Sequence, residues 1–130
     1  MNLQPKPLLY LATPYTHKDP RIIEARYFNV TQMTANIISH FDVIVFSPIT
    51  YSHYLAEYMS EDFDWYTFDL GILDKCDYLG VLKLKGWDIS EGVQLEIDYA
   101  KDNDIPIIKF TMKNWYKVLS TKLADFTKKE

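Results

Sequence analysis

The sequence predicts an α/β fold: three layers in which an open parallel sheet of four to five strands carries helices on both faces. Two observations predict it. Short apolar runs recur along the chain, and segments of helical length separate them. Apolar strands that alternate with helices are joined by right-handed crossovers, which produces a parallel sheet covered on both sides. Flavodoxin-like and Rossmann-like domains have this architecture.

Four apolar runs have the length and composition of strands buried on both faces. The first ends at Thr13-Pro14 and the second at Ser47-Pro48, where proline interrupts the pattern. We expect the strands at residues 7–12, 42–46, 78–84 and 106–110.

Segments of helical length lie between and after these strands. We expect helices at residues 20–40, 51–59, 62–75, 90–103 and 113–126. Ligands of open parallel sheets bind outside the carboxyl ends of the strands. The loops at residues 13–19, 47–53 and 85–92 are therefore where we expect the functional residues.

The composition limits the classes of function. A chain of 130 residues, 48% of them hydrophobic, with no repeat or Gly/Ser linker predicts one domain over residues 1–130. A net charge of -4 gives no basic footprint for a nucleic-acid polymer. The single cysteine, Cys76, excludes an intramolecular disulfide, and the three histidines are too scattered to suggest a metal site.

The hydropathy pattern predicts neither a membrane span nor a signal peptide. No uncharged apolar run reaches about 18 residues, and residues 1–7 lead straight into a strand. We therefore expect a cytoplasmic protein without a membrane partner.

Two carboxylates, Glu96 and Asp69, fall on apolar helix faces. Such a position is costly unless the acid is paired, hydrogen-bonded or at a pocket wall, and active sites tolerate that cost. The alternative is that each acid lies at the solvent edge of its face or caps a neighbouring loop. The apolar faces consist of Val93, Leu95, Ile97, Tyr99 and Ala100 around Glu96, and of Trp65, Phe68, Ile72, Leu73 and Cys76 around Asp69.

Two carboxyls that converge on a pocket suit glycosyl transfer. One attacks an oxocarbenium-like centre while another group manages the proton of the leaving group. Acid–base hydrolysis of other bonds fits the same pair.

The loop before Glu96 predicts an anion site. Ser90 and the backbone at Gly92 lie where a strand's carboxyl end meets a helix N-terminus, whose free N–H groups and dipole favour anions. The alternative is helix capping alone, because Ser90 is a good N-cap residue and Asp88-x-x-Glu91 reads as a variant capping box.

Two other loops offer polar candidates for ligand binding. The first contributes Thr13, Tyr15, His17 and Arg21, and the second contributes Ser47 and His53. The alternatives are a surface turn with Pro20 starting the helix and, for His53, a hydrogen-bonded partner instead of an acid–base group.

The chain resembles the nucleoside 2-deoxyribosyltransferase-like family, in particular a branch of short members related to nucleoside 5′-monophosphate N-glycosidases. The resemblance spans roughly residues 8–110, and its most specific part is the Ser-x-Gly-Val-x-x-Glu segment after a strand. It rests on Tyr10-Leu11-Ala12-Thr13-Pro14-Tyr15, Ser47-Pro48-Ile49, Asp69, Cys76-Asp77 and Ser90-x-Gly92-Val93-x-x-Glu96.

The resemblance implies roles for several residues. Glu96 would be the nucleophile that attacks the anomeric carbon, Asp69 would assist with the base or sugar, and Tyr10 would orient the nucleophile. Ser90 has the spacing of a phosphate-binding serine, with Gly92 supplying a backbone N–H. The first loop would complete the anion pocket through Thr16, His17 or Arg21.

The resemblance also implies a homo-oligomer, a dimer or higher. A polar residue near a neighbouring subunit's C-terminus, for which Asn114 and Ser120 are candidates, would complete the site. The last helix would carry the interface through Trp115, Tyr116 and Leu119.

The function we expect is cleavage or transfer at the N-glycosidic bond of a (deoxy)nucleoside or its 5′-monophosphate, through a covalent glycosyl–Glu96 intermediate. No metal or organic cofactor is implied. Tyr15, Trp65 and Trp87 are candidates to stack on the base. The alternatives are an NAD-type glycohydrolase, a nucleotide-binding module without turnover, and a structural or interaction protein.

Overall fold

The computed structural model describes residues 5–129 and confirms a three-layer α/β fold with four parallel strands. The strands are β1 (Leu8–Ala12), β2 (Ile44–Phe46), β3 (Tyr78–Leu82) and β4 (Ile107–Phe110), in the spatial order β2-β1-β3-β4. From β1 the chain moves to β2 on one side, and it then crosses back to form β3 on the other side of β1. In parallel α/β sheets this reversal creates a crevice at the carboxyl ends of the strands.

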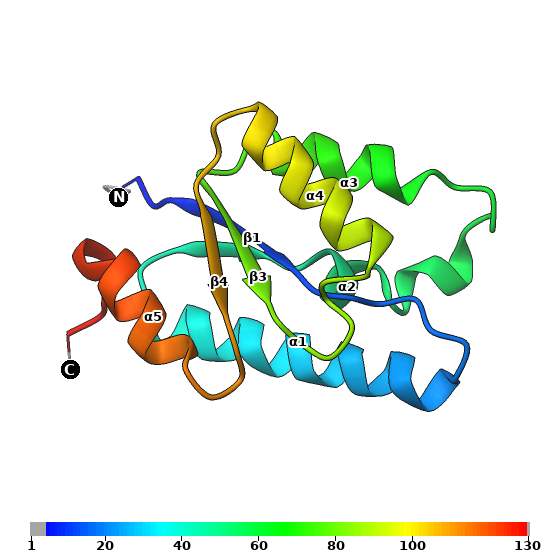
Figure 1. Ribbon diagram of the computed structural model, residues 1–130, viewed down its shortest axis with the longest axis horizontal. Helices are drawn as coiled ribbons and strands as arrows, with labels where there is room; N and C mark the ends of the chain where they lie inside the picture. The colour runs from blue at the N-terminus through cyan, green and yellow to red at the C-terminus, as the bar shows by residue number, and fades with distance from the viewer. Residues whose placement is uncertain (1–4, 130) are drawn as a thin grey trace.

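Helices cover both faces of the sheet (Figure 1). One face carries α1 (Pro20–His40) and α5 (Trp115–Lys122), and the opposite face carries α3 (Trp65–Leu73) and α4 (Glu91–Asp102). The short α2 (Pro48–Ser52) follows β2, and the 3₁₀ helices η1 (Leu55–Tyr58) and η2 (Ala124–Phe126) complete the structure.

Alternation along β1 divides the core into two clusters, because successive side chains of a strand point to opposite faces. Leu9 and Leu11 pack with Val30, Met33 and Ile37 of α1. Tyr10 and Ala12 face the other cluster, which is completed by these buried residues of α3, α4 and β3: Leu73, Leu79, Val81, Val93, Ile97 and Ala100. Tyr10 is therefore a fully buried polar side chain beneath α4.

Two predicted helices differ from the structure. The helix expected at 51–59 begins earlier, as α2, because the Ser47 hydroxyl accepts a bond from the Thr50 N–H and Pro48 fits the first helical position. The rest of the expected range contains only the 3₁₀ helix η1. The helix expected at 113–126 is divided into α5 and η2.

Two residues are buried differently from what we expected. Leu95 is 39% exposed, because it lies two positions from Val93 and from Ile97 and so points away from their side of the helix. Leu119, expected at a subunit interface, is fully buried in the cluster between α5 and the sheet.

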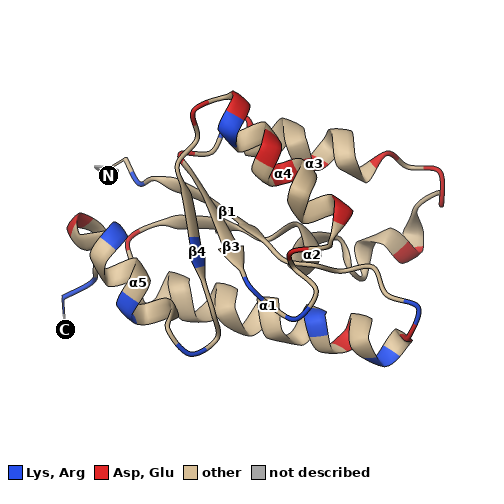
Figure 2. Cartoon of the chain, viewed as in Figure 1, with Lys and Arg blue, Asp and Glu red and all other residues tan. Residues whose placement is uncertain are grey.

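Charge is unevenly distributed over the two faces. Figure 2 shows Asp and Glu residues along α3, α4 and the segments next to them, whereas Lys residues mark α5, β4 and the C-terminal end. Within residues 5–129, no helix is both long enough and apolar enough to cross a membrane.

Candidate active site

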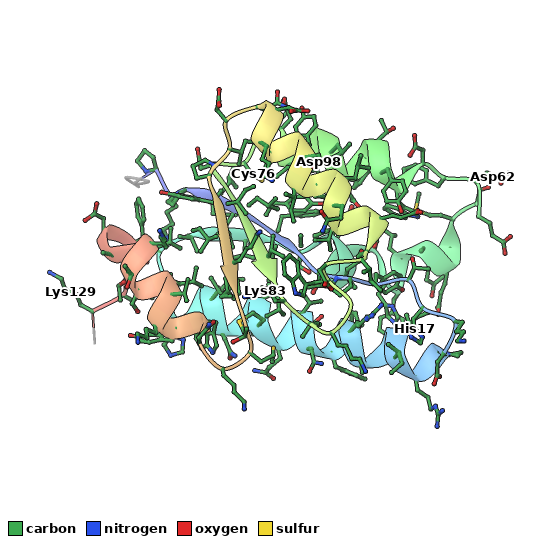
Figure 3. The ribbon with its side chains drawn as sticks, in the orientation of Figure 1. His17, Asp62, Cys76, Lys83, Asp98 and Lys129 are labelled. Carbon is green, nitrogen blue, oxygen red and sulfur yellow. The ribbon has the colours of Figure 1, made fainter. Side chains whose placement is uncertain are left out.

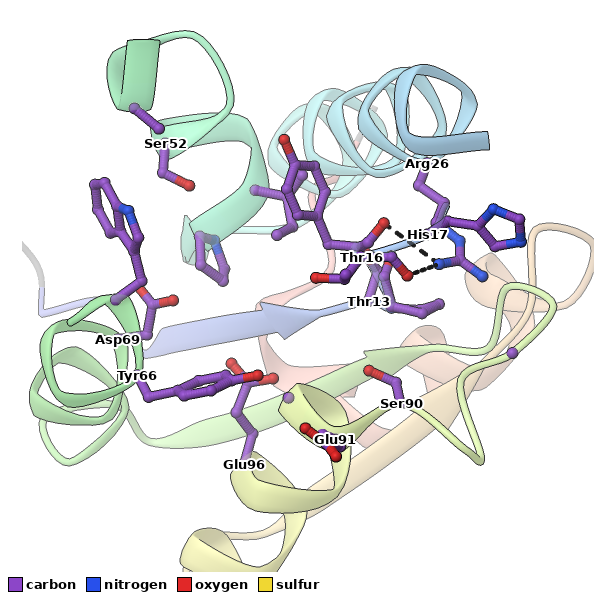
Figure 4. Close-up of a pocket in the computed structure, with 18 of the residues that line it drawn as sticks. Thr13, Thr16, His17, Arg26, Ser52, Tyr66, Asp69, Ser90, Glu91 and Glu96 are labelled. Atoms are coloured by element: carbon purple, nitrogen blue, oxygen red, sulfur yellow. Dashed lines mark hydrogen bonds between the residues drawn. The ribbon is translucent and has the colours of Figure 1, made fainter. Parts of the chain in front are cut away.

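A cavity of about 720 Å³ opens at the carboxyl ends of the strands. Four segments surround it: the loop after β1, the α2–η1 region, the start of α3, and the loop from β3 into α4. Figure 4 shows Glu96, Asp69 and Tyr66 in one part of the cavity, and Arg26, His17 and Thr16 in another. The cavity thus lies at the carboxyl ends of the strands, where the sequence predicts the functional loops, and the strand order adds that this is beside the switch point of the sheet.

Glu96 projects from the buried side of α4 into this cavity. It is 8% exposed, and Val93, Ile97 and Ala100 on the same side of the helix belong to the core. The Tyr10 hydroxyl donates a hydrogen bond to Glu96 Oε2. Since Tyr10 stands on a central strand, this bond fixes the position of the carboxyl group and leaves Oε1 for other partners.

Asp69 reaches the same cavity from α3. Burial raises the pKa of Asp69 to about 7. Burial also raises the pKa of Glu96 to about 8, against the opposing effect of the Tyr10 hydrogen bond, and the charge of Asp69 raises it further. Two carboxyls that influence each other titrate as a pair, so between these two pKa values the two groups hold about one proton between them.

Tyr10 itself stays protonated. Burial, followed by the nearby charges of Glu96 and Asp69, raises the pKa of its hydroxyl far above the usual value. Tyr10 is therefore a permanent donor to Glu96 and not an acid or base.

The N-terminus of α4 borders the cavity beside Glu96. The Ser90 hydroxyl accepts a hydrogen bond from the Val93 N–H at 3.3 Å, so the capping role that we set beside anion binding is present. Ser90, Glu91 and Gly92 all line the cavity. A side chain at position 92 would meet the Tyr66 ring, whose nearest carbon lies 3.5 Å from an ideal Cβ there.

The first loop brings donors to the opposite wall. The Asp19 N–H donates to His17 Nδ1 at 2.9 Å, so a neutral His17 ring carries its proton on Nε2. Arg26, from α1, donates to the backbone carbonyls of Tyr15 and Thr16. Figure 3 places His17 near the start of α1. This wall, unlike the Glu96–Asp69 wall, is rich in hydrogen-bond donors.

The cavity unites most of the residues that we predicted. Glu96, Asp69, Ser90, Gly92, Thr13, Tyr15, His17 and also Thr16 and Trp65 line it, and Tyr10 touches it through Glu96.

Besides Tyr10, four residues predicted on the loops or as stacking partners of the base lie outside the cavity lining. Arg21 points to solvent and pairs with Asp19 at 3.1 Å, because the N-cap of α1 holds it there. Ser47 is buried as the N-cap of α2. His53 bonds the Tyr15 hydroxyl at 2.6 Å and Glu24 at 2.8 Å, which is the partner role given as its alternative. Trp87 is not part of the cavity lining, and the ammonium groups of Lys83 and Lys109 lie 5.9 and 5.3 Å from the centre of its ring.

Sequence reasoning missed Arg26, Tyr66, Ser52 and Asp64, which all line the cavity. Arg26 is on the long first helix, where one basic residue among many polar ones carries no periodic signal. Tyr66 follows Trp65, and an aromatic pair at a helix start reads as core or rim. For Asp64 the signal existed, since it is the N-cap of α3 and bonds the Thr67 N–H at 3.1 Å.

Across the described residues, no group of three or more His, Cys, Asp or Glu side chains is placed to hold a metal ion. The groups that can hold a ligand are therefore the carboxyls, the Ser90 and Thr hydroxyls, the His17 imidazole and the Arg26 guanidinium.

Comparison with known families gives one match. The family described as "Domain of unknown function (DUF1937)" matches residues 7–112, which include every strand and all the segments that form the cavity. A comparison with curated proteins finds no match. The chain therefore belongs to the DUF1937 family.

Proposed function

We propose that the protein cleaves or transfers at the N-glycosidic bond of a nucleoside or nucleoside 5′-monophosphate, through a covalent glycosyl–Glu96 intermediate. One observation carries the proposal: Glu96 is buried on the core side of α4, yet its carboxyl borders a large cavity that a second carboxyl, Asp69, also enters. Carboxyl pairs of this kind perform substitution at anomeric carbons. The resemblance to the nucleoside 2-deoxyribosyltransferase-like family supports the same reaction.

The first step starts from the form in which Glu96 is ionised and the one proton of the pair is on Asp69. Glu96 Oε1 then attacks the anomeric carbon as the bond from that carbon to the base nitrogen breaks. The departing nitrogen takes the proton of Asp69, which burial keeps available at neutral pH. The Tyr10 hydroxyl keeps Oε2 bonded, so that Glu96 presents one oxygen. The positive charge that develops on the sugar lies between two carboxyl groups, which stabilise it.

In the second step, water or another base attacks the same carbon and displaces Glu96. The Asp69 carboxylate takes the proton that the attacking water or base loses. This restores both carboxyl groups and releases either a free sugar or a new nucleoside.

The remaining walls suit the rest of such a substrate. Phe63, Trp65 and Tyr66 supply aromatic surface for a base near Asp69. His17 on the first loop and the N-terminus of α4 supply donors suited to a 5′-phosphate, while Glu91, in the first turn of α4, opposes one. Each nucleoside is therefore best compared directly with its own 5′-monophosphate.

A second candidate is a nucleotide-binding module without turnover. The observation that favours it is the pKa of Glu96, about 8, which keeps the carboxyl largely protonated in the empty site at neutral pH. A protonated carboxyl binds a ligand by hydrogen bonds but does not attack carbon.

The test is chromatographic detection of free base from purified protein. The panel contains nucleosides and deoxynucleosides, their 5′-monophosphates, and NAD, each with and without an acceptor base. The variants are Glu96→Ala and a matched control, Asp98→Asn, which changes an exposed acid on the same helix. We expect base release by the wild type and by Asp98→Asn, and none by Glu96→Ala.

Three outcomes would decide against this reaction. Release from NAD alone assigns the site to a dinucleotide glycohydrolase. Nucleotide binding without release, preserved in Glu96→Gln, establishes the binding module. If the protein neither binds these compounds nor releases base from them, nucleosides and nucleotides are excluded as its ligands. Homo-oligomer formation stays a prediction, which light scattering during size-exclusion chromatography tests on the same samples.

A further inference from the structure

Arg26 connects the two loops that close the donor-rich wall of the cavity. Its Nη1 donates to the carbonyl oxygens of Tyr15 at 3.3 Å and Thr16 at 3.0 Å, and its Nη2 donates to the carbonyl oxygen of Lys85 at 2.9 Å. Residues 15 and 85 belong to loops that follow different strands, β1 and β3. One guanidinium therefore bonds both loops from α1.

Gly86 is shaped to accept this guanidinium. Its φ of 93° lies in the left-handed region that side chains disfavour. An ideal Cβ at position 86 would lie 2.8 Å from Arg26 Nη2, which is closer than real Cβ contacts. The backbone of the β3–α4 loop thus packs directly against Arg26.

No carboxylate of residues 5–129 forms an ion pair with Arg26. The ion pairs in the described part of the chain involve Lys6, Arg21 and His53, and Arg26 is in none of them. Its bonds go to backbone carbonyls, although its side chain borders a cavity with acids on it. The guanidinium group is planar and rigid, so it can donate to all three carbonyls only when the two loops keep their present separation. These bonds therefore fix the backbone of both loops relative to each other.

We propose that Arg26 is a positioning residue, which sets the separation between the first loop and the β3–α4 loop so that both loops contact one ligand held against Glu96. This inference rests on the proposed function for its kinetic consequence. Its structural part, the connection of two loops, is measurable without any substrate.

The first test is kinetic. Arg26→Ala is expected to lower kcat/KM for base release about 100-fold, because displacing a substrate by about 1 Å has effects of that size. Arg26→Lys keeps the charge but not the fork, and we expect it to recover only part of the loss. The matched control is Arg21→Ala, which removes an exposed arginine of the same helix and should leave the rate unchanged.

Chemical rescue separates positioning from general damage to the fold. Guanidinium chloride at tens of millimolar should raise the rate of Arg26→Ala several-fold and leave the wild type and Arg21→Ala unchanged. Full activity in Arg26→Ala, full activity in Arg26→Lys, or no rescue by guanidinium would each overturn the inference.

The second test is amide hydrogen exchange on the ligand-free protein. In Arg26→Ala, peptides that cover residues 13–19 and 84–90 should exchange faster, while peptides from the β1 and β3 core keep wild-type rates. Gly86→Ala should accelerate the same two loops by displacing the guanidinium, and it should add little to Arg26→Ala.

The two proposals fail in different ways. If the wild type releases no base but both loops respond in exchange, the proposed reaction is wrong and the connection made by Arg26 stands. If exchange of the two loops is unchanged in Arg26→Ala, the inference is wrong, whatever the wild type catalyses.

Discussion

Glu96 and Arg26 reach the same cavity from helices on opposite faces of the sheet, and the protein treats the two charges differently. Glu96 has one hydrogen bond, from Tyr10, among apolar neighbours, whereas Arg26 bonds three backbone carbonyls. Poor solvation raises the pKa of Glu96 to about 8. The Glu96 environment thus adjusts a proton equilibrium, and the Arg26 environment fixes a distance.

We therefore expect the surroundings of Glu96 to set the pH dependence of the reaction, and the loops bound by Arg26 to set the position of the ligand. Changes near Glu96 should alter pH dependence, because they alter which groups hold the shared proton. Changes in the first loop or in the β3–α4 loop should alter ligand binding or ligand position without moving the pH profile.

Asp69→Asn should lower kcat for base release by about 100-fold, within the range typical of removing a general acid. The wild type needs Glu96 ionised and Asp69 protonated, which is the less populated of the two singly protonated forms because Glu96 has the higher pKa. That form is most abundant between the two pKa values, so the rate should be bell-shaped with a maximum between about pH 7 and 8. In Asp69→Asn the fall on the alkaline side should disappear, because asparagine has no proton to lose. If the rate of Asp69→Asn still falls at alkaline pH, Asp69 is not the general acid.

Glu96→Gln should be more stable than the wild type at alkaline pH, by several kcal/mol. The pKa of Glu96 is raised in the folded protein, so the stability that its proton confers is complete below about pH 4.5 and is lost as pH rises through about 8. Glutamine cannot ionise, so the Glu96→Gln variant keeps this stability at high pH.

Urea unfolding at pH 5 and pH 9 measures this difference. The advantage of Glu96→Gln should be small at the lower pH and large at the higher one, while Asp98→Asn should give the same difference at both. Parallel stability curves for wild type and Glu96→Gln would contradict the burial of an ionisable Glu96. No substrate is needed, so this result is independent of the proposed reaction.

Tyr10→Phe should reduce kcat about 10-fold, in line with the loss of one hydrogen bond to a charged group. Because that bond lowers the pKa of Glu96, its removal should move the pH optimum upward. Phenylalanine fills the same buried space, so thermal unfolding should change little below pH 6. A lower rate with an unmoved optimum would mean that Tyr10 only supports packing.

The sequence predicted the Glu96 side of the cavity better than the Arg26 side, for a physical reason. Glu96 and Asp69 lie on regular helices, where an acid among apolar residues at helical spacing breaks a visible pattern. The four strands, their parallel arrangement and the cavity at their carboxyl ends follow from the same kind of periodicity and from crossover rules.

The loop side depends on contacts between distant segments. Arg26 meets Lys85, 59 positions away, through a carbonyl oxygen that every residue possesses. Arg21 and His53 are polar side chains on the loops where we expected ligand-binding residues. In the structure, however, Arg21 pairs with Asp19, and His53 bonds Glu24 and Tyr15. Side-chain direction in a loop is set by such partners, and no spacing rule in the sequence encodes them.

His53→Phe should have the smallest effect, a rise in KM of a few-fold with kcat and the pH optimum unchanged. His53 lies behind the cavity wall and bonds the hydroxyl of Tyr15, so it acts on a ligand only by holding that side chain. Its other partner, Glu24, has a side chain 46% exposed, and water competes for such a pair, which therefore contributes at most about 1 kcal/mol. Phenylalanine keeps the stacking on Tyr27, whose ring centroid is 4.2 Å away, and removes both hydrogen bonds. Steady-state kinetics across the pH range measure all three quantities, and a shifted optimum would place His53 in the proton chemistry of Glu96 and Asp69 instead of behind the opposite wall.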